Sequence, residues 1–571
     1  MKYSKCFIFL WYNTNPINHN PLHHQQQSQI NMKLIQLSLF LLGITLHSLP
    51  LCAQENFTVQ EGQLVDRKKN IIYELIGEDS GDIYYVNYKG RDRYIEKSDV
   101  NQNVLASVPV PKNELYNDKK LIFVNAIIMR DFIGFLYSCV DKTNNEYTVY
   151  IRKHDKENLK ATDELKELLR APMPATKAVM MTPFSDPNYV QDVISSIYRK
   201  ISYVSDDKTK FMIYRNNNDY DKNAHEKIHI SVFDQNLDRL LEKDYEMKYN
   251  SKDFTVSSIL LNNQGEVYIT GVHFLTGRNA AEKRQKKEQD YIYHLISIKA
   301  SDLAVSDMPI KLKSNFISEL KIALNNQGKP FAVGFYSEKD ENSIKGVFFL
   351  TFDPETGNVS TEVETVFDKD FIQDGMDKQE LRQSNRSATK GSLEMAYHDL
   401  NALIVHANNE VTLLAEKVYT SSVTFTDASG KTSTSIVYHY DEIILINLSP
   451  TGEVRWKTKI PKSQTGKDNS SFAVLSLSDK IVVLFNDNQK NVDMSPESQP
   501  EPLTTKNYGV MVVEVNTGTG KFEKNLILPR STNDIMLKPR EALVSNSGFV
   551  ILNGNKDGRK YQFVEVRFSK N

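Results

Sequence analysis

The chain has 571 residues, and 40% of them are hydrophobic, which is enough to bury a large core. Its 70 lysine and arginine residues are balanced by 72 aspartate and glutamate residues, for a formal net charge of -2. This balance leaves no basic excess of the kind that attracts nucleic acid, so nucleic acid is not expected as a partner.

Residues 1–31 do not have the composition of folded protein. Between Asn13 and Asn31 almost every residue is Asn, His, Gln, Pro or Ser, and such a segment cannot bury a core. We expect this part to be a non-native or disordered leader, with translation beginning at Met32.

Residues 32–53 have the order of features found in a signal peptide. A positively charged start is followed by the apolar run Leu34–Leu46 and then by a small residue, Ala53. Cleavage after Ala53 would export the chain to the periplasm, the outer surface or the extracellular medium. A second interpretation stays open, in which Cys52 carries a lipid, although Leu51 is larger than the residue usual before such a cysteine.

Cysteine use agrees with an exported chain that is stabilised by burial. Cys6 and Cys52 lie in the removed segment, which leaves Cys139 alone in the mature chain. A single cysteine allows neither an internal disulfide nor a thiolate metal cluster. Past Gln54 no apolar run approaches the roughly 18 residues of a membrane helix, so no transmembrane segment is expected in the mature chain.

Short strand patterns dominate the rest of the sequence. Runs rich in Val, Ile, Tyr, Phe and Thr end in turns of Asn, Asp, Gly and Pro. The runs come in pairs, each a turn with a strand followed by a partner strand that ends in a polar turn. Seven pairs, preceded by a weaker eighth at 82–88 with 91–96, lie at 131–138 with 147–153, 210–215 with 228–234, 265–271 with 292–299, 328–334 with 347–353, 409–416 with 442–448, 479–486 with 509–515 and 548–554 with 562–568.

One turn is repeated letter for letter. The pentapeptide Leu-Asn-Asn-Gln-Gly occurs at 261–265 and again at 324–328, each time before a short apolar segment. A repeated unit of this kind indicates a repeat architecture. Partner strands such as Val347–Leu350 and Ile443–Ile446 are continuous apolar runs, which is typical of strands buried on both faces.

These patterns predict an all-β fold, a β-propeller of seven or eight four-stranded blades formed by residues 54–571, with a few short helices in insertions. Segment Glu453–Lys459 is expected to be an outer strand. The last pair ends at Phe568, so the N-terminal segment Phe57–Val65 is expected to supply its missing outer strand and to close the ring. Two propeller-like halves divided near Asn385 are an alternative.

Long insertions separate some of the strands, at 160–199, 278–290, 371–399 and 488–506. Two stretches within or near the first of them have helical spacing, Thr162–Arg170 and Asp186–Lys200. We expect these two stretches to be short helices that cap or bridge blades.

Two segments carry a family resemblance. Residues Ile228–Tyr249, with the core Val232–Leu237, and Glu442–Gln464, with Gly452-Glu453-Val454-Arg455-Trp456, resemble uncharacterised exported propeller-like proteins of Gram-negative bacteria. The resemblance covers most of the mature chain. It implies a fold and an export route, and it brings no known active residues.

The best metal candidate is the polar run Asn216–Asn223. Asp219 and Asp221 are its candidate ligands, because Ca²⁺ prefers several oxygen ligands from one flexible loop. The run lacks the spacing, the central glycine and the terminal glutamate of a calcium-binding hand, and a solvated hairpin tip explains it equally well. No other cofactor is predicted.

A second acidic cluster lies at Asp368, Asp370, Asp374 and Asp377. Paired carboxylates perform acid and base chemistry on sugars, but exposed charge on an insertion loop is the commoner origin of such a cluster. Trp456, the only tryptophan of the mature chain, is expected to pack in the core.

The histidines are scattered singly, with no zinc pattern, and neither a nucleophile elbow nor a phosphate loop is present. The sequence therefore favours a non-enzymatic binding or assembly module of the cell envelope, which binds a protein or a glycan through one face of the propeller. The alternative is a carbohydrate-active hydrolase or lyase with carboxylates at the central channel, because a propeller can host either function.

Overall fold

All described residues belong to one compact unit, residues 57–571. The leader and the signal peptide predicted for 1–53, the loop with Asp219 and Asp221, and the helix predicted at 186–200 all lie outside the described residues. The computed structural model describes residues 57–66, 71–90, 92–112, 114–141, 143–144, 146–172, 202–216, 224–275, 289–338, 343–353, 358–426, 430, 432–466, 469–494, 498–529, 535–545, 547–556 and 560–569.

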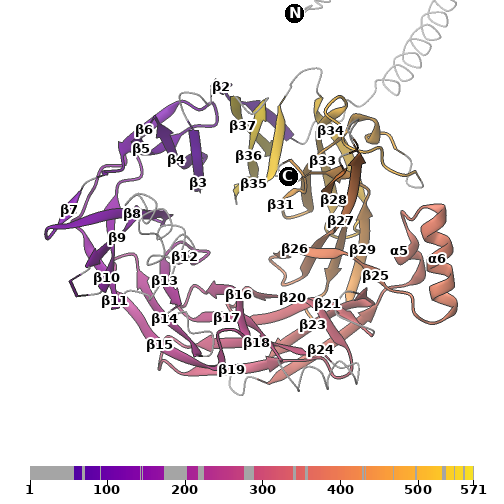
Figure 1. Cartoon of the computed structure of the whole chain (residues 1–571), viewed down its shortest axis with the longest axis horizontal. Helices are drawn as coiled ribbons and strands as arrows, with labels where there is room; N and C mark the ends of the chain where they lie inside the picture. The colour runs from indigo at the N-terminus through magenta and orange to yellow at the C-terminus, as the bar shows by residue number, and fades with distance from the viewer. Residues whose placement is uncertain are drawn as a thin grey trace, which may run out of the picture. The chain divides into compact units, whose positions relative to one another are not determined.

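The unit 57–571 is almost entirely β, and its described residues form eight antiparallel sheets of four main strands each (Figure 1). We number the sheets in chain order. Sheet 1 consists of β3 (Ile71–Asp79), β4 (Asp82–Lys89), β5 (Asp92–Ser98) and β6 (Val104–Pro109), and sheet 2 of β8 (Lys119–Ile128), β9 (Ile133–Asp141), β10 (Glu146–His154) and β11 (Lys166–Pro172), with β7 (Leu115–Tyr116) at its edge. Sheet 3 consists of β12 (Ser202–Val204), β13 (Lys210–Asn216), β14 (His225–Asp234) and β15 (Arg239–Asn250). Sheet 4 consists of β16 (Phe254–Leu261), β17 (Val267–Phe274), β18 (Tyr291–Ile298) and β19 (Val305–Ile310).

Sheets 5 to 8 repeat the same order. Sheet 5 consists of β20 (Phe316–Leu324), β21 (Pro330–Ser337), β23 (Gly346–Phe352) and β24 (Val359–Val366), and sheet 6 of β26 (His398–Val405), β27 (Val411–Thr426), β28 (Thr432–Leu448) and β29 (Val454–Ile460), with β30 (Gln464–Thr465) paired to β28. Sheet 7 consists of β31 (Ala473–Ser476), β32 (Lys480–Asn488), β33 (Tyr508–Asn516) and β34 (Phe522–Pro529). Sheet 8 consists of β35 (Met536–Ser545), β36 (Phe549–Lys556), β37 (Lys560–Phe568) and β1 (Phe57–Glu61), with β2 (Val65–Asp66) paired to β37. A separate two-stranded sheet joins β22 (Ser343–Ile344) to β25 (Met395–Ala396).

The strand pairs predicted from the sequence are confirmed. In each of the eight sheets the predicted pair forms the second and third strands, which are hydrogen-bonded to each other in antiparallel register. The predicted outer strand at Glu453–Lys459 is confirmed as β29. Continuous apolar runs form these middle strands because both of their faces are covered by neighbouring sheets.

The two ends of the unit meet in sheet 8, as the sequence predicts. Strand β1 pairs with β37 from Phe57 opposite Phe568 to Glu61 opposite Val564. The side chain of Gln562 then donates a hydrogen bond to the carbonyl oxygen of Gly62 at 2.5 Å. The N-terminal strand therefore fills the outer position that the C-terminal strands leave vacant.

Hydrophobic clusters lie between each sheet and the next. Between sheets 5 and 6, for example, Phe335 and Phe349 pack against Leu413 and Ile444. A cluster also joins the last sheet to the first, where Phe549 and Phe563 of sheet 8 pack with Ile83 and Tyr85 of sheet 1. Seven of the eight clusters hold 10 to 17 buried residues, whereas this last one holds five. Sheets 8 and 1 thus share the least apolar surface.

The repeated pentapeptide forms the turn between the first two strands of sheets 4 and 5. The Asn262 side-chain oxygen accepts hydrogen bonds from the backbone N–H groups of Gln264 and Glu266, and Asn325 does the same two and four residues further on. Gly265 and Gly328 complete the turns with φ of +90° and +75°, a region that favours glycine. The predicted turns are confirmed.

The two repeated turns also contact each other, because the Asn262 amide donates to the Gly328 carbonyl oxygen at 3.3 Å. This hydrogen bond links the inner hairpins of sheets 4 and 5.

The helix predicted at Thr162–Arg170 is wrong. Residues from Lys166 onward form strand β11, which pairs with β10. A register shift after Val149 inserts one extra residue, so that Leu168 and Leu169 are both buried although they are neighbours in the strand. The bulge gives the apolar residues the spacing of a helix.

The insertion at 371–399 does contain helices, as predicted for the insertions in general. Helices α5 (Lys369–Gln373) and α6 (Lys378–Thr389) lie beside sheets 5 and 6 (Figure 1). Asn385, the boundary of the two-halves alternative, lies inside α6, and the contacts that define the unit 57–571 place no division there.

Candidate functional site

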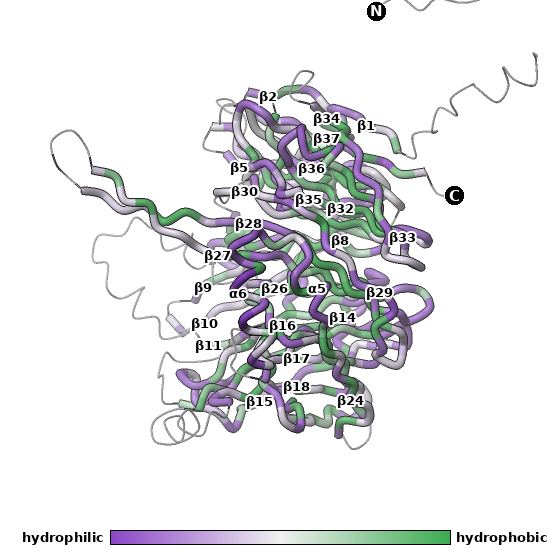
Figure 2. Tube along the Cα trace, turned by 90° about the vertical axis from the view of Figure 1, so that its right-hand side faces the viewer, coloured by the Kyte–Doolittle hydropathy of each residue, from purple (hydrophilic) through white to green (hydrophobic). Residues whose placement is uncertain are grey.

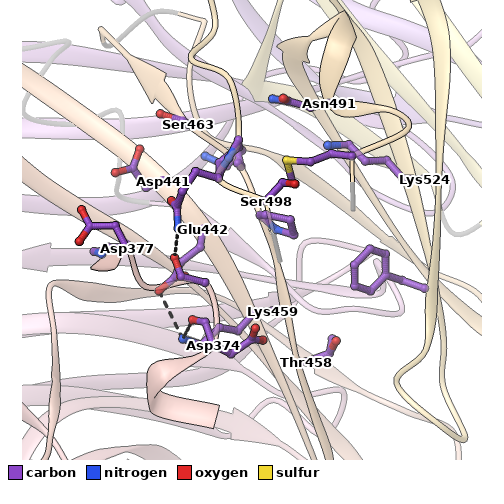
Figure 3. Close-up of a pocket in the computed structure, with 18 of the residues that line it drawn as sticks. Asp374, Asp377, Asp441, Glu442, Thr458, Lys459, Ser463, Asn491, Ser498 and Lys524 are labelled. Carbon is purple, nitrogen blue, oxygen red and sulfur yellow. Dashed lines mark hydrogen bonds and ion pairs between the residues drawn. The ribbon is translucent and has the colours of Figure 1, made fainter. Parts of the chain in front are cut away.

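A pocket of about 810 Å³ opens between the outer strands of sheets 6 and 7. Its walls come from β27, β28 and β29, from the hairpin before β34, from α5 and α6, and from the segment after the short 3₁₀ helix Gln489–Asn491. Figure 3 shows Asp374, Glu442 and Lys459 close together, with Asn491, Ser498 and Lys524 on another side of the pocket. Polar and charged side chains from segments far apart in the sequence therefore converge here.

The acidic cluster noted in the sequence builds one wall of this pocket by capping helices. The side chain of Asp368 accepts the N–H of Phe371 at the start of α5. Asp377 accepts the N–H groups of Gln379 and Glu380 at the start of α6, and the Glu380 carboxylate accepts the N–H of Asp377 in return. This reciprocal arrangement is a capping box, which the letters Asp-Lys-Gln-Glu at 377–380 already contain. Of the four aspartates, Asp374 and Asp377 line the pocket.

Glu442 is the central carboxylate of the site. The ring Nε2 of His398 lies 3.1 Å from its Oε1, and the Lys459 ammonium lies 3.7 Å from the same atom. Burial opposes the charged form, but the hydrogen bond with His398 and the charge of Lys459 outweigh it and lower the pKa of Glu442 to about 2. His398 Nδ1 lies 2.9 Å from the carbonyl oxygen of Ala396, so both ring nitrogens face oxygen atoms that can accept a hydrogen bond.

Lysines of β29 attach α5 to sheet 6. Lys459 donates to the carbonyl oxygens of Ile372 and Asp374, at 3.3 and 2.8 Å, where the last carbonyls of α5 have no partner within the helix. Burial lowers the pKa of Lys459, and the neighbouring charge of Glu442 works against that change. Lys457 pairs with Asp368 at 2.6 Å. The helical wall is thus held by two lysines that are two residues apart on one strand.

A buried ion pair lies behind the pocket. The ammonium of Lys462 and the carboxylate of Glu416 are 2.6 Å apart, and both side chains are fully buried. Lys462 also donates to the Tyr440 carbonyl and the Gln464 side chain, while Ser471 donates to the second oxygen of Glu416. Such a pair is tolerated in a core only when every donor and acceptor is satisfied.

The opposite wall repeats this arrangement. Lys524 pairs with the buried Asp487 at 2.6 Å, and the Asn491 amide donates to the same carboxylate at 2.8 Å. These contacts fix the ammonium of Lys524 at the edge of the pocket.

Asp441 differs from the other acids, because its Oδ1 is buried and accepts no hydrogen bond from the described residues. It lies beside Tyr419, whose pKa is raised to about 12 by burial and by the charge of Asp441. Lys521, in the hairpin at the rim, is exposed and pairs with no carboxylate of the described chain. Asp441 and Lys521 both line the pocket.

His229 and His294 are held by hydrogen-bonding partners, and Trp456 packs in the core, as the sequence predicts for this tryptophan. His229 lies 2.9 Å from both Asp244 and Ser231, and His294 lies 2.8 Å from Asp307. Trp456 is 8% exposed, and its indole N–H donates to the carbonyl oxygen of Thr517 at 2.7 Å. Among the described residues no group of histidine, cysteine and carboxylate side chains could hold a metal ion. The calcium site proposed at Asp219 and Asp221 lies outside the described residues.

Two further carboxylates lie on β20 and β26, the first strands of sheets 5 and 6, and do not line this pocket. Glu319 of β20 accepts the N–H of Leu400 in β26 at 2.7 Å, and burial raises its pKa to about 7. Burial also raises the pKa of Asp399, the residue before Leu400. Asp399 directly precedes Leu400, whose N–H Glu319 accepts, and the charge of Asp399 adds to the rise in the pKa of Glu319.

Sequence reasoning missed Glu442, Lys459 and His398 as members of one site. The signal was present in part, since Asp441 and Glu442 precede a buried apolar run and three lysines occur within residues 457–462. Their convergence depends on the register of β28 with β29, which pairs Ile443 with Ile460.

Comparison with known proteins assigns no family: no family model matches the chain, and no curated protein matches it at a significant level. Solved structures with some likeness include apo prolyl oligopeptidase B from Galerina marginata, at 9% identity over 88% of this chain and 56% of that chain with a TM-score of 0.34. Others are an acylaminoacyl peptidase from Pyrococcus horikoshii (11%, 79% and 46%, TM-score 0.30) and the tricorn protease (11%, 86% and 38%, TM-score 0.30). The chain spans about half the length of these proteins or less, and the likeness assigns it no activity.

The described residues contain no helix of the length and apolar character that crossing a membrane requires.

Replacing Glu442 by Gln should change how stability depends on pH. The pKa of Glu442 falls from an ordinary 4.5 to about 2 in the folded chain, so its ionised form stabilises the fold above pH 4.5 and that stability is lost as the pH drops towards 2. Glu442→Gln should therefore lower the free energy of unfolding at pH 7 by up to about 3 kcal/mol, and the difference from the natural chain should shrink below pH 4.5. Urea unfolding between pH 3 and pH 7 measures this.

The matched control is Glu453→Gln, an exposed glutamate at the turn before β29. Its unfolding curves should follow those of the natural chain at every pH. If Glu442→Gln lowered the free energy of unfolding by the same amount at pH 3 and at pH 7, the neighbouring groups would not be stabilising the charged form of Glu442.

Proposed function

We propose that this chain is an exported, closed β-propeller of eight blades, and that it acts as a binding module of the cell envelope for a protein or a glycan held in the pocket between sheets 6 and 7. Closure is supported by the hydrophobic cluster between sheets 8 and 1 and by the pairing of β1 with β37. Export is supported by the signal-peptide pattern of residues 32–53 and by a single, buried cysteine, Cys139.

The observation that carries the binding role is the state of the charges in the pocket. Glu442, Lys459, Lys462 and Lys524 are each held by one or more buried partners, so their positions are fixed before any ligand arrives. A proton-transfer catalyst needs a group whose pKa lies near the working pH, and the low pKa of Glu442 keeps this carboxylate charged instead. Fixed charges of both signs around a large pocket suit recognition of a polar ligand.

Trp456 provides a direct readout of binding, because it is the only tryptophan after residue 53. Its ring lies beneath Gly520, which lines the pocket together with Phe522. Titration of the mature chain with two probes, soluble peptidoglycan fragments and a periplasmic protein fraction, should produce a saturable change in Trp456 fluorescence with one of them. The responding probe identifies the ligand as glycan or protein.

Asp441→Asn should weaken this binding by about tenfold, or about 1.4 kcal/mol, because it removes a negative charge that lines the pocket. The control Glu157→Gln changes an exposed side chain on a turn of sheet 2 and should leave the titration unchanged. Equal affinities for Asp441→Asn and the natural chain, or no response to either probe, would contradict binding in this pocket.

A second candidate function is a carbohydrate-active hydrolase or lyase, and the neighbouring carboxylates Glu319 and Asp399 favour it. Burial raises the pKa of both, and a carboxylic acid with a pKa of about 7 can donate a proton near neutral pH. Such an enzyme also needs a second carboxylate at a defined distance.

If this function holds, the mature chain should release reducing or unsaturated ends from at least one polysaccharide in a panel. Glu319→Gln and Asp399→Asn should each lower that rate by about a hundredfold or more, and the natural rate should fall as the pH rises above about 7, where Glu319 loses its proton. Product release at the natural rate by both variants, or no product from any polysaccharide, would exclude these carboxylates as catalysts.

A further inference from the structure

Strands β27 and β28 continue beyond sheet 6 as a two-stranded arm, which we define as Val418–Thr426 and Thr432–Tyr440. The two halves of the arm pair with each other from Val418 opposite Tyr440 to Thr426 opposite Thr432. Figure 2 shows this hairpin projecting from the rest of the unit 57–571, with hydrophobic segments along it. The arm makes β27 and β28, with 16 and 17 residues, the longest of the described strands.

The arm contains no charged residue in either half, although a quarter of the whole chain is charged. Thirteen of its 18 residues are Thr, Val, Ile, Phe or Tyr, which favour strands, and the rest are four Ser and one His. Phe425 is 59% exposed and Ile436 is 64% exposed. Natural proteins protect a free strand edge with charge, proline or a covering segment, and this arm carries no such protection within its described residues.

One edge of the arm has no paired strand among the described residues from Tyr419 to Thr426. The edge of β27 that faces away from β28 pairs with β26 up to Lys417, which lies opposite His398. The N–H of Val418 then donates a hydrogen bond to the carbonyl oxygen of Tyr397. From Tyr419 to Thr426 no described strand lies against that edge. The outer edge of β28 is partly covered, because β30 pairs with His439 and Tyr440.

We infer that the free edge of β27 pairs with the same edge of a second copy of this chain, antiparallel and about a two-fold axis at Ser422. In that register Ser422 faces its own counterpart, Ser421 faces Val423, and Tyr419 faces Phe425. Facing residues have the same parity along the strand, so each pair lies on one face of the joined sheet, and two aromatic pairs form on that face. The contact is isologous and therefore closes as a dimer.

The charges favour a second copy over a different partner. Self-pairing about a two-fold axis sets the residue on the axis opposite its own copy and brings the residues on either side of it close together, so a strand with charges of one sign would repel itself, whereas a strand without charge does not. The formal net charge of the whole chain is only -2, so two copies approach without strong repulsion. An arm evolved for a charged partner would carry the complementary charge.

Charge placed at the two-fold axis tests this inference. Ser422→Lys and Ser422→Asp each set two like charges opposite each other, so each variant alone should be monomeric by light scattering coupled to size exclusion, whereas the natural mature chain is a dimer. An equimolar mixture of the two variants should restore the dimer, because the facing charges are then opposite. Circular dichroism should be unchanged in both, since Ser422 is exposed.

The control is Ser435→Lys, an exposed position on β28 in the same arm, which should remain dimeric. A monomeric natural chain would overturn the inference, and so would a mixture of Ser422→Lys and Ser422→Asp that stays monomeric. Dissociation by Ser435→Lys as complete as that by Ser422→Lys would show that β27 is not the contact edge.

Discussion

The whole structure depends on the burial of the middle strands on both faces. In β32, for example, Val482, Val483 and Leu484 are consecutive and fully buried, although neighbouring residues of a strand point to opposite sides. Each sheet therefore needs a neighbour on either side. A row of eight such sheets with two free ends would expose two apolar faces, and the cluster of Phe549 and Phe563 with Ile83 and Tyr85 covers both of them at once. That cluster is small, and β1 strengthens sheet 8 at this position by giving it a fourth strand.

The pocket lies where insertions pack against the outer strands of sheets 6 and 7. Inner strands are occupied with packing, so the outer strands of sheets 6 and 7 are free to carry helices α5 and α6 and the segment after β32. Helix ends and strand lysines then satisfy one another, as Lys459 does with the carbonyl oxygen of Asp374. The charged side chains that pack the insertion onto the sheet also surround the pocket. These side chains are therefore held in fixed positions.

The sequence predicts the strands well because many middle strands contain continuous apolar runs, such as Ile443–Ile446, and because turns with their own side-chain hydrogen bonds separate strands, as at Asn262 and Asn325. It predicts the insertions less well. A bulge makes Leu168 and Leu169 imitate a helix, and the arm beyond Lys417 is rich in Thr and Ser and so resembles a loop until its pairing is known. The pocket was beyond reach, because Glu442 and His398 are 44 residues apart and meet only when β26 and β28 flank the same strand.

The central claim is that the N-terminal strand completes the last sheet and so closes the array. Hydrogen–deuterium exchange of the mature chain, read by mass spectrometry on peptides from β1 and β37, tests it most directly. The account predicts that the amides of β1 exchange as slowly as those of β37, because both belong to one hydrogen-bonded sheet. Exchange of β1 at the rate of an unfolded peptide, with β37 still protected, would contradict it.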